Sequence, residues 1–559
     1  MEREDRRVES QWDCFSRWIC CVGVVTFDLE LGQALEFVFP SHFKLSDAEK
    51  LNLCYLAFPD SNSGCMGDSQ FHFRIKCSGV GCGGAPPQQP FVHKASQPAL
   101  EASSSHYFGF VYFRQMRDPT NKRGYFQKSV VLLTRLPYTK LFSHLVKLIA
   151  PEYFDNGEVS LESACYDIDR WPVPIPGKQL QLPVMGTLVR IQVPSKQDKL
   201  PVVPSQSAPA PSSLSLSSVY EVDMYRLLYP VVPYIHLIWE LVLLNEPIAI
   251  MAPSPDICSE VVQALVNSIM PLRYSSDYRP FFTIHDSEFK AYTTKTQSPP
   301  SVIVGVTNPF FIKALQHWPH ILRLGELALN EKKGKKQGKN SSAAGALEAK
   351  PGLFTLYKAF LDRDKVLLQA LWGKSSSSGK KKPLAAQNAI LRRHLLELTE
   401  SFIIPLERYV TSLMPLQRHI SPWRAIPSLK PFDLDAFLKS VAHAGPQLTT
   451  GQKGNWVGLY KAFSQSINFR EWLKVRQDEA NARIRALYVD ALCKADLGFW
   501  MKDKSEIEVV DFLIKIRGLL KSSSGPHSLS PLQQSLLSSQ VDSLVQNLPD
   551  DLQRTLMMT

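Results

Sequence analysis

The residues that come nearest to an acid–base pair are Asp286 and Glu288, in the segment IHDSEF. Two carboxylates share acid and base work only when both reach one reacting group. Residues two positions apart on a helix do not face each other. Asp286 follows an apolar run that ends at Ile284, and this position predicts that its side chain caps the N-terminus of a helix. The alternative for Asp286 is a contact to a protein partner.

Two other patterns could bind a nucleotide or a metal. Gly79, Gly81 and Gly84 match GxGxxG, but a dinucleotide site needs a strand before the glycines and a helix after them. The sequence APPQQP follows instead, so we predict a loop. His317 and His320, in HWPH, are separated by a proline that interrupts a helical face. We predict a turn between a helix and a strand there.

The motifs of several enzyme classes are absent from the sequence. It contains no GxxxxGK[ST] phosphate-binding loop, no GxSxG nucleophile elbow, no HExxH pattern and no CxxC pair. Basic patches interleaved with aromatic residues are missing from the segments that should fold. We therefore expect no covalent or acid–base active site, no cofactor, no metal and no nucleic-acid partner.

The formal net charge of +11 is concentrated in low-complexity stretches within residues 329–384. The lysines that contribute most of it are Lys332, Lys333, Lys335, Lys336, Lys339, Lys374, Lys380, Lys381 and Lys382. We expect basic linkers here, on either side of a helical segment at 353–371. A solvated linker is the simpler interpretation, and weak attraction to anionic membrane surfaces is the alternative.

The elements that position these residues begin with three short apolar runs, at 247–252, 280–284 and 301–306. Each run is followed by turn residues and a helix-like stretch, which predicts a parallel sheet covered by helices over residues 218–328. Binding loops of such sheets follow the carboxyl ends of the strands. The candidate partner-contact residues in these loops are Pro253, Ser254, Asp256, Asp286, Ser287, Asn308 and Pro309. Phe310 and Phe311 are predicted to be core anchors.

Residues 1–193 read as a separate sheet-plus-helix domain. A β-hairpin is predicted at 16–40, two more strands at 108–116 and 129–138, and an amphipathic helix at 138–149. The Gly-, Pro- and Ser-rich residues 78–105 predict a loose insertion. A Pro/Ser-rich linker at 194–217 separates this domain from the parallel sheet.

From residue 385 to 559 the pattern is helical. Apolar residues recur at three- and four-residue spacing after Ala385, and Pro405 predicts a kink or break in that helix. A long helix is predicted at 468–494, capped by Asn468. Two further helices, at about 505–520 and 529–546, complete a helical C-terminal module.

We expect a cytoplasmic protein. The N-terminal sequence MEREDRR is charged and is not followed by an apolar core at signal-peptide spacing. The most apolar stretch, residues 225–252, contains His236, Glu240 and Glu246, which argues against a membrane span. Any membrane association is therefore expected to be indirect, through a partner.

Several long strings, in this order, resemble one family. They are CVGVVTFDLELGQALE (21–36), GYFQKS (124–129), DIDRWP (167–172), the connection WPVPIPG (171–177), EPIAIMAPSPDICSE (246–260), MPLRYSSDYRPFFTIHD (270–286), PPSVIVGVTNPFF (299–311) and ILRRHLLELTESFIIPLERYV (390–410). The chain is similar to the tripartite DENN domain family along nearly its whole length, and most similar to the group of DENN domain-containing protein 6. The Gly/Pro/Ser run at 78–105 departs from that pattern.

The resemblance implies an α/β plus all-α protein. The first domain would be a longin-like sheet-plus-helix module, the second a doubly wound α/β module and the third helical. It also implies a guanine-nucleotide exchange factor for a Rab-family small GTPase, which docks between the first two modules. The sequence does not identify which Rab is bound. The resemblance points to a Rab that acts on recycling endosomes.

Two other functions remain open at this stage. A GTPase-activating protein supplies an arginine finger to the phosphoryl-transfer reaction, and Arg170 and Arg273 are the candidates. A Rab or Arf effector or scaffold without exchange activity would prefer the GTP-loaded GTPase, whereas an exchange factor prefers the nucleotide-free form.

Overall fold

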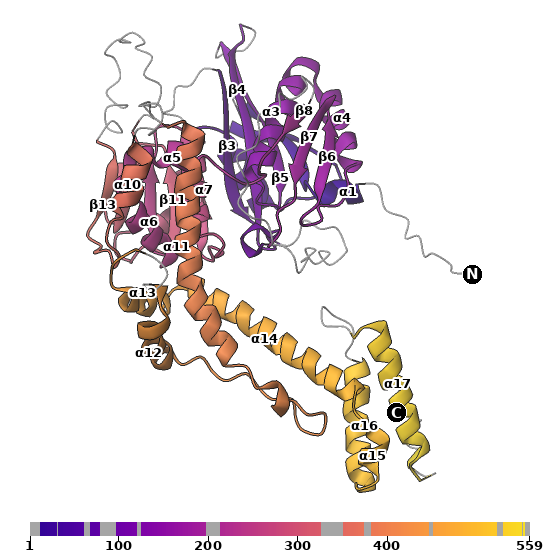
Figure 1. Ribbon diagram of the computed structural model, residues 1–559. Coiled ribbons are helices and arrows are strands. Elements are labelled where there is room, and N and C mark those ends of the chain that lie inside the picture. Colours follow the sequence, from indigo (N-terminus) through magenta and orange to yellow (C-terminus); the bar gives the residue numbers. More distant parts are fainter. Residues whose placement is uncertain are drawn as a thin grey trace. The chain divides into compact units, whose positions relative to one another are not determined.

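The computed structural model describes residues 12–28, 30, 32–60, 67–78, 97–119, 124–196, 213–325, 350–373, 382–446, 451–521, 529–549 and 552–553 (Figure 1). Most of the predicted insertion and linkers, the three glycines of the GxGxxG match and all the named lysines except Lys382 lie outside the described residues. The chain divides into two compact units, Met1–Ser401 with Gln447–Asn468, and Phe402–Pro446 with Phe469–Thr559. The fold is mixed α/β with a helical C-terminal part, as the sequence predicts.

The first sheet has five antiparallel strands in the order β2-β1-β5-β4-β3. Its strands are β1 (Cys21–Asp28), β2 (Gly32–Phe39), β3 (Gly67–Lys76), β4 (His106–Arg117) and β5 (Tyr125–Thr134), accompanied by α1 (Asp13–Ser16), α2 (Asp47–Leu56), α3 (Thr139–Asn156) and α4 (Glu158–Asp169). The predicted hairpin, the two later strands and the helix are confirmed, although α3 ends later than predicted.

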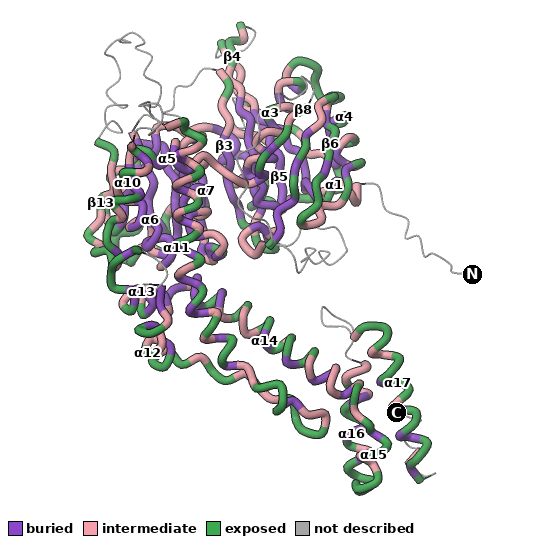
Figure 2. Tube along the Cα trace, in the orientation of Figure 1, coloured by how far each residue is buried: buried purple, intermediate pink, exposed green. Residues whose placement is uncertain are grey.

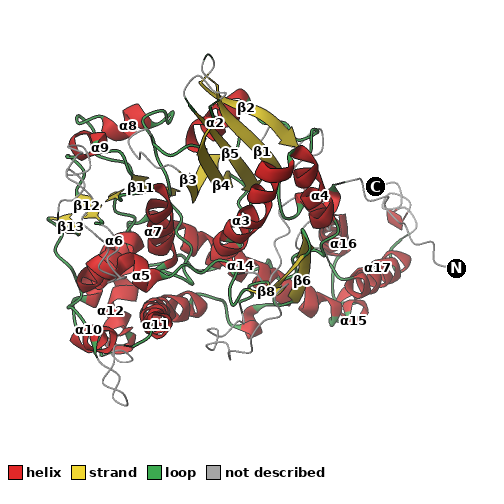
Figure 3. Ribbon diagram, turned by 90° about the horizontal axis from the view of Figure 1, so that it is seen from above, coloured by secondary structure: helices red, strands yellow, loops and turns green. Residues whose placement is uncertain are grey.

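Helices lie on both faces of this sheet. Alternate residues of β4 show this arrangement: Tyr107, Val111 and Phe113 join a core cluster that includes Leu53 of α2, whereas the ring of Phe110 lies 5.4 Å from that of Phe142 on α3. Figure 3 shows α3 lying along the sheet. A strand covered on both faces is apolar, which explains why residues 107–113 of β4 form an unbroken buried run, whereas the far end of the strand is exposed (Figure 2).

A small sheet, β6-β7-β8, follows α4. Its strands are β6 (Gln179–Val184), β7 (Thr187–Gln192) and β8 (Ser213–Ser215). The WPVPIPG connection is held by Trp171, whose ring lies 5.4 Å from that of Trp18 and whose indole N–H donates to the Pro183 carbonyl at 2.8 Å. The Pro-rich connecting segment at 171–177 therefore packs against the first domain through Trp171.

The central sheet has the order β10-β11-β9-β12-β13 and is parallel except for its last strand. Its strands are β9 (Ile248–Met251), β10 (Asp277–Arg279), β11 (Val302–Val306), β12 (His320–Arg323) and β13 (Gly352–Thr355). The strand predicted at 280–284 was placed wrongly, because the ladder ends before Pro280, which has no N–H to donate. The helix predicted over 353–371 is also wrong in its first part, which forms β13.

The helices of the central module are α5 (Met224–Leu228), α6 (Ile235–Leu243), α7 (Pro255–Asn267), α8 (Phe289–Thr293), α9 (Phe310–Ala314), α10 (Lys365–Trp372) and α13 (Trp456–Phe463). Among the described residues, one stretch, Met224–Leu243, has the length and apolar composition of a membrane span. It comprises α5, a 3-10 helix and α6, and it is mostly buried. A buried core helix meets the same criterion, so the stretch is weak evidence for a span.

The helical part contains α11 (Leu384–Ser412), α12 (Leu434–Ala444), α14 (Ile467–Cys493), α15 (Leu497–Met501), α16 (Glu506–Lys521) and α17 (Pro531–Gln546). Helix α11 continues through Pro405, so the chain does not break there, and a kink at Pro405 stays a prediction. The prediction that Asn468 caps the long helix is also wrong, since α14 begins one residue earlier. Asn468 is fully buried and donates to the carbonyls of Val242 and Leu243 at the end of α6.

Candidate functional site

The first domain meets the central module along the edge strand β3. Phe71 of β3 packs edge-on against Phe281, with ring centroids 5.1 Å apart, and the two rings share one core cluster. At the edge of β3 that is not paired with β4, the His72 backbone N–H donates to Ser259 Oγ of α7 at 3.3 Å. We call residues 284–289 and 308–311 the junction loops, because they follow the central strands and contact the first domain.

A chain of charges fastens β3 to the strand β10. Asp277 accepts a hydrogen bond from Arg74 at 2.5 Å and from the Nε of Arg279 at 3.0 Å, and the Arg74 guanidinium lies 4.2 Å from the centre of the Tyr278 ring. Burial by itself raises the pKa of Asp277, but a hydrogen bond from His106 and the charges of Arg279 and Arg74 lower it well below its usual value. The carboxylate is therefore held ionised.

The same chain continues into the first junction loop. Glu288 pairs with Arg279 on one side and with Lys76 of β3 on the other, and it accepts a hydrogen bond from the Tyr292 hydroxyl at 3.0 Å. Burial opposes ionisation of Glu288, yet the Arg279 charge and Lys76 lower its pKa overall. Glu288 is thus a positioning residue that fixes the loop.

Asp286 lies at the base of this loop. Its side chain is buried, and Oδ1 accepts from the backbone N–H of Glu288 at 2.9 Å. The predicted N-cap role is displaced, because helix α8 begins at Phe289 and Glu288 occupies the cap position. Burial raises the pKa of Asp286, against the opposing charge of Arg279. Ser287, the next residue, is exposed.

The tip of the first junction loop touches helix α2. The His285 ring stacks on Tyr55 at 4.6 Å, with the ring planes 13° apart. Ile284 beside it is 40% exposed. This contact was not predicted, because Tyr55 and His285 are far apart in the sequence.

The second junction loop is tied to the first domain by Asn308. Asn308 is buried, accepts from the Phe310 N–H at 2.9 Å and donates through Nδ2 to Asp60 Oδ1 at 3.1 Å. Pro309 is half-buried. Phe311 is a core residue as predicted, whereas the core prediction for Phe310 is wrong, since 54% of its surface is exposed.

The remaining candidates lie at the start of α7. Pro253 and Ser254 are half-buried, and Asp256 is exposed in the first turn of the helix. Ser254 occupies the N-cap position without a side-chain cap bond. The structure thus brings Asp286, Ser287, Asn308 and Pro309 to the junction loops, and it leaves the role of all seven candidates as a prediction.

Ile284 and Phe310 are exposed apolar residues of the junction loops. The sequence did not predict that they would be exposed. The Phe310 ring lies 6.1 Å from that of Phe289, which joins the two junction loops. A signal was present, because Ile284 lies between a strand and a helix and Phe310 lies at a helix start, where a partner-binding loop is expected. Periodicity alone does not separate an exposed anchor of this kind from a core residue.

The structure contains two features apart from the junction. Among the described residues, one group could hold a metal ion: His236, Asp364 and His394.

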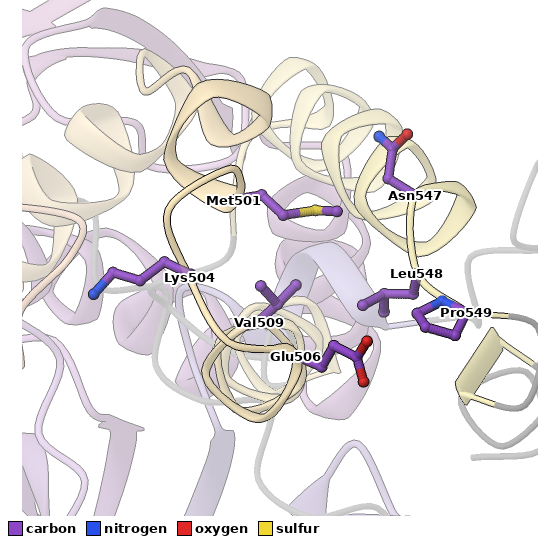
Figure 4. A pocket seen from close by; sticks show the side chains of 7 residues that line it. All are labelled: Met501, Lys504, Glu506, Val509, Asn547, Leu548 and Pro549. Carbon is purple, nitrogen blue, oxygen red and sulfur yellow. The ribbon is translucent and has the colours of Figure 1, made fainter.

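The second unit has a cavity of about 470 Å³, where Met501, Val509 and Leu548 converge, with Glu506, Asn547 and Pro549 beside them (Figure 4). Lys504, also at this cavity, donates to Glu508. The cavity lining offers no cluster of groups suited to catalysis.

The sequence comparisons agree with this architecture. A family model described as the DENN (AEX-3) domain matches residues 125–320, and a model of the DENND6 C-terminal domain matches 497–559. Protein DENND6B of Mus musculus is 50% identical over 99% of this chain and 95% of its own length. Protein DENND6A of Mus musculus is 49% identical over 100% and 93%. A Protein DENND6 homolog of Dictyostelium discoideum is 31% identical over 90% and 77%.

Proposed function

The chain belongs to the DENN domain family, in its DENND6 group, and on that premise we propose that it promotes GDP release from a Rab GTPase. It would act as a regulator of the GTPase and would itself perform no covalent or acid–base step. In this proposal the first sheet is the longin-like module and the central sheet the doubly wound module. The GTPase docks where the two meet.

The observation that supports this proposal most is the surface of the junction loops. Ile284, Ser287 and Phe310 are exposed there, while Asp286, Glu288 and Asn308 beneath them are fixed by hydrogen bonds and ion pairs. A surface that is already ordered loses less conformational entropy on binding. Exposed apolar side chains on such a support are suited to hold a flexible switch segment of a GTPase.

The mechanism follows from thermodynamic linkage. A GTPase holds its nucleotide and Mg²⁺ through switch loops, which become disordered when those contacts are lost. If the junction loops bind the switches in the nucleotide-free arrangement, bound nucleotide weakens this complex by some factor. The complex must then weaken nucleotide binding by the same factor. Exchange therefore needs shape and polarity complementary to the open GTPase, and no catalytic side chain.

We place the protein in the cytoplasm and, when engaged, on recycling endosomes. Membrane association would be indirect, through the lipid-anchored GTPase, aided by the lysine-rich linkers within 329–384. The contribution of each lysine near an anionic surface is about 1 kcal/mol. The proposal follows from the family and from the charge pattern of the sequence.

The experiment that tests exchange is the release of a fluorescent GDP analogue from a panel of purified Rabs, with and without the full chain. Acceleration confined to one or two Rabs would establish the activity and identify the substrate. A folded, monodisperse protein that accelerates release from no Rab would overturn the proposal.

Two alternatives are distinguished by related measurements. Arg170 and Arg273, the arginine-finger candidates, are both exposed. If the protein activates hydrolysis, Arg→Ala substitution at one of them abolishes that stimulation. An effector or scaffold binds the GTP-loaded Rab more tightly than the nucleotide-free form, whereas an exchange factor shows the reverse preference.

A further inference from the structure

Three segments that are distant in the sequence bring His236, Asp364 and His394 together. His236 lies in the first turn of α6, Asp364 caps the N-terminus of α10 and His394 lies in α11. One potential ligand atom from each residue lies within 4.8 Å of the other two. The proposed exchange function uses none of these residues.

The neighbouring contacts fix the two helices that carry the imidazoles. Trp239 of α6 donates through its indole N–H to Thr399 Oγ1 of α11 at 2.9 Å, one turn beyond His236. Closer to the N-terminus of α11, its Asn388 Oδ1 accepts a hydrogen bond from the Tyr225 N–H of α5 at 3.2 Å. The approach of the two histidines is therefore set by helix packing on both sides.

Asp364 is positioned by a buried carboxylate, that of Glu240. Glu240 is fully buried and accepts from the N–H groups of Phe360 and Leu361 at 2.9 and 2.7 Å, and from the Tyr357 hydroxyl at 3.1 Å. These bonds fix the segment that leads to Asp364. One oxygen of Asp364 caps α10 by accepting from Val366 and Leu367, while the other lies 4.0 Å from His394 Nδ1.

The distances approach those of a metal site. The Nε2 atoms of His236 and His394 are 3.0 Å apart. Two nitrogens on one tetrahedral zinc, each about 2.05 Å from the metal, are separated by about 3.3 Å. The ligand atoms of the three residues lie within 4.8 Å of one another, so the carboxylate needs to approach by up to about 1.5 Å, a movement within the range of a side-chain rotation. His394 and Asp364 side chains are 20% and 25% exposed, so an ion can reach the group from solvent.

We propose that His236, His394 and Asp364 bind one Zn²⁺ ion, with a water molecule in the fourth position. Imidazole nitrogens and a carboxylate oxygen are ligands that zinc accepts in proteins, and three protein ligands with an open fourth position are a recurring arrangement. The ion joins α6, the start of α10 and the first part of α11. It therefore stabilises the docking of α11 on the central module.

The competing explanation is a hydrogen bond between the two imidazoles, since 3.0 Å also suits an N–H···N contact. The test is zinc binding by the full chain after dialysis against a chelator, with affinity measured by competition against a chromophoric zinc indicator. One zinc per chain is expected, and Co²⁺ in its place should give the absorption spectrum of a tetrahedral site. A chain that binds no zinc, or Co²⁺ without that spectrum, overturns the proposal in favour of the hydrogen bond.

Two variants test proposed ligands, and a third variant is the control. His394→Gln removes one imidazole, and Asp364→Asn keeps a good helix cap while it removes the charge, so the second variant should fold. Each is expected to weaken zinc binding by at least about tenfold. Loss of a residue that only hydrogen-bonds to a metal ligand already lowers metal affinity by about that factor. His443→Gln is the control, because His443 is exposed on α12.

The unfolding midpoint supplies a second measurement. Zinc should raise the midpoint of the wild type and of His443→Gln, and it should leave that of Asp364→Asn unchanged, because only an intact site binds the folded state preferentially. Equal zinc affinity in all variants, or an equal rise in midpoint for Asp364→Asn, would mean that the ion binds elsewhere and would refute the assignment.

Discussion

The Nδ2 group of Asn308 donates to the carboxylate of Asp60 at 3.1 Å, although the two residues are 248 positions apart. Both side chains are buried. The bond joins the second junction loop to the end of the chain segment that carries α2. It shows that a loop predicted to face a partner also contributes to the attachment of the first domain to the central module.

This bond can be tested by exchanging its partners. Asn308→Asp places two carboxylates against each other and should destabilise the fold by about 3 kcal/mol, since an uncompensated buried charge is costly. Adding Asp60→Asn restores one amide and one carboxylate and should recover most of the loss. Thermal unfolding of the two single variants and the double variant measures the coupling. Strict additivity of the two effects would contradict the contact.

The exposed ring of Phe310 provides the test of the docking surface. Phe310→Asp should reduce the Rab-specific acceleration of GDP release at least about tenfold, because a buried aromatic anchor contributes about 2 kcal/mol or more to an interface. Leu356→Asp is the matched control, as Leu356 is 99% exposed and lies just after β13. Equal rates for both variants and the wild type would place the docking surface elsewhere.

Gly305 in β11 is required by close packing. A Cβ there would lie 2.5 Å from the Pro280 carbonyl oxygen, 2.6 Å from Cys258 Sγ and 2.9 Å from Val262 Cγ2. Gly305→Ala should therefore destabilise the protein by about 2 kcal/mol, since the overlap includes backbone. Gly352→Ala, in β13, meets no atom within 4 Å and serves as the control. Denaturant unfolding of the pair checks the difference.

The backbone N–H and the side chain of Asn468 both form hydrogen bonds within the first unit. Its side chain accepts from the Ser275 N–H at 2.8 Å and donates to two carbonyls of α6, while its own N–H donates to Asn245 Oδ1 at 2.7 Å. Asn468→Ala leaves buried polar groups without partners and should cost about 3 kcal/mol. The exposed Asn547→Ala is the control. A change of less than about 1 kcal/mol in unfolding free energy would show that water replaces these bonds.

His72 should make stability depend on pH below neutrality. Burial lowers its pKa from 6.5 to about 3. Below pH 6.5 the unfolded chain binds a proton at this residue and the folded chain does not, so stability falls as pH decreases towards 3, by about 1.4 kcal/mol per pH unit. His72→Phe removes this contribution, and its unfolding midpoint should fall less than that of the wild type between pH 7 and 5.5.

The control for the pH measurement is His443→Gln, an exposed histidine. It should retain the wild-type pH dependence, because the substitution leaves the buried His72 unchanged. If His72→Phe also kept the full dependence, other groups would be responsible for it.

Elements with a strong local signal were predictable. The hairpin of β1 and β2 follows from two apolar runs around a turn, and α16 and α17 follow from helical periodicity. The wrong secondary-structure predictions concern segments whose local sequence favours one structure, while contacts with residues distant in the sequence favour another. Residues 353–355 read as part of a helix but pair with β12, because the sheet offers them backbone partners.

The sequence by itself determined the family and the mixed α/β and helical character of the fold, because these depend on patterns within short segments. Only the tertiary structure decided which loop residues are buried. Asn308 and Phe310 are two positions apart, yet one is held by Asp60 and the other faces solvent. The contacts that distinguish them come from residues distant in the sequence, and the same is true of the grouping of His236, Asp364 and His394. Local periodicity carries no information about either.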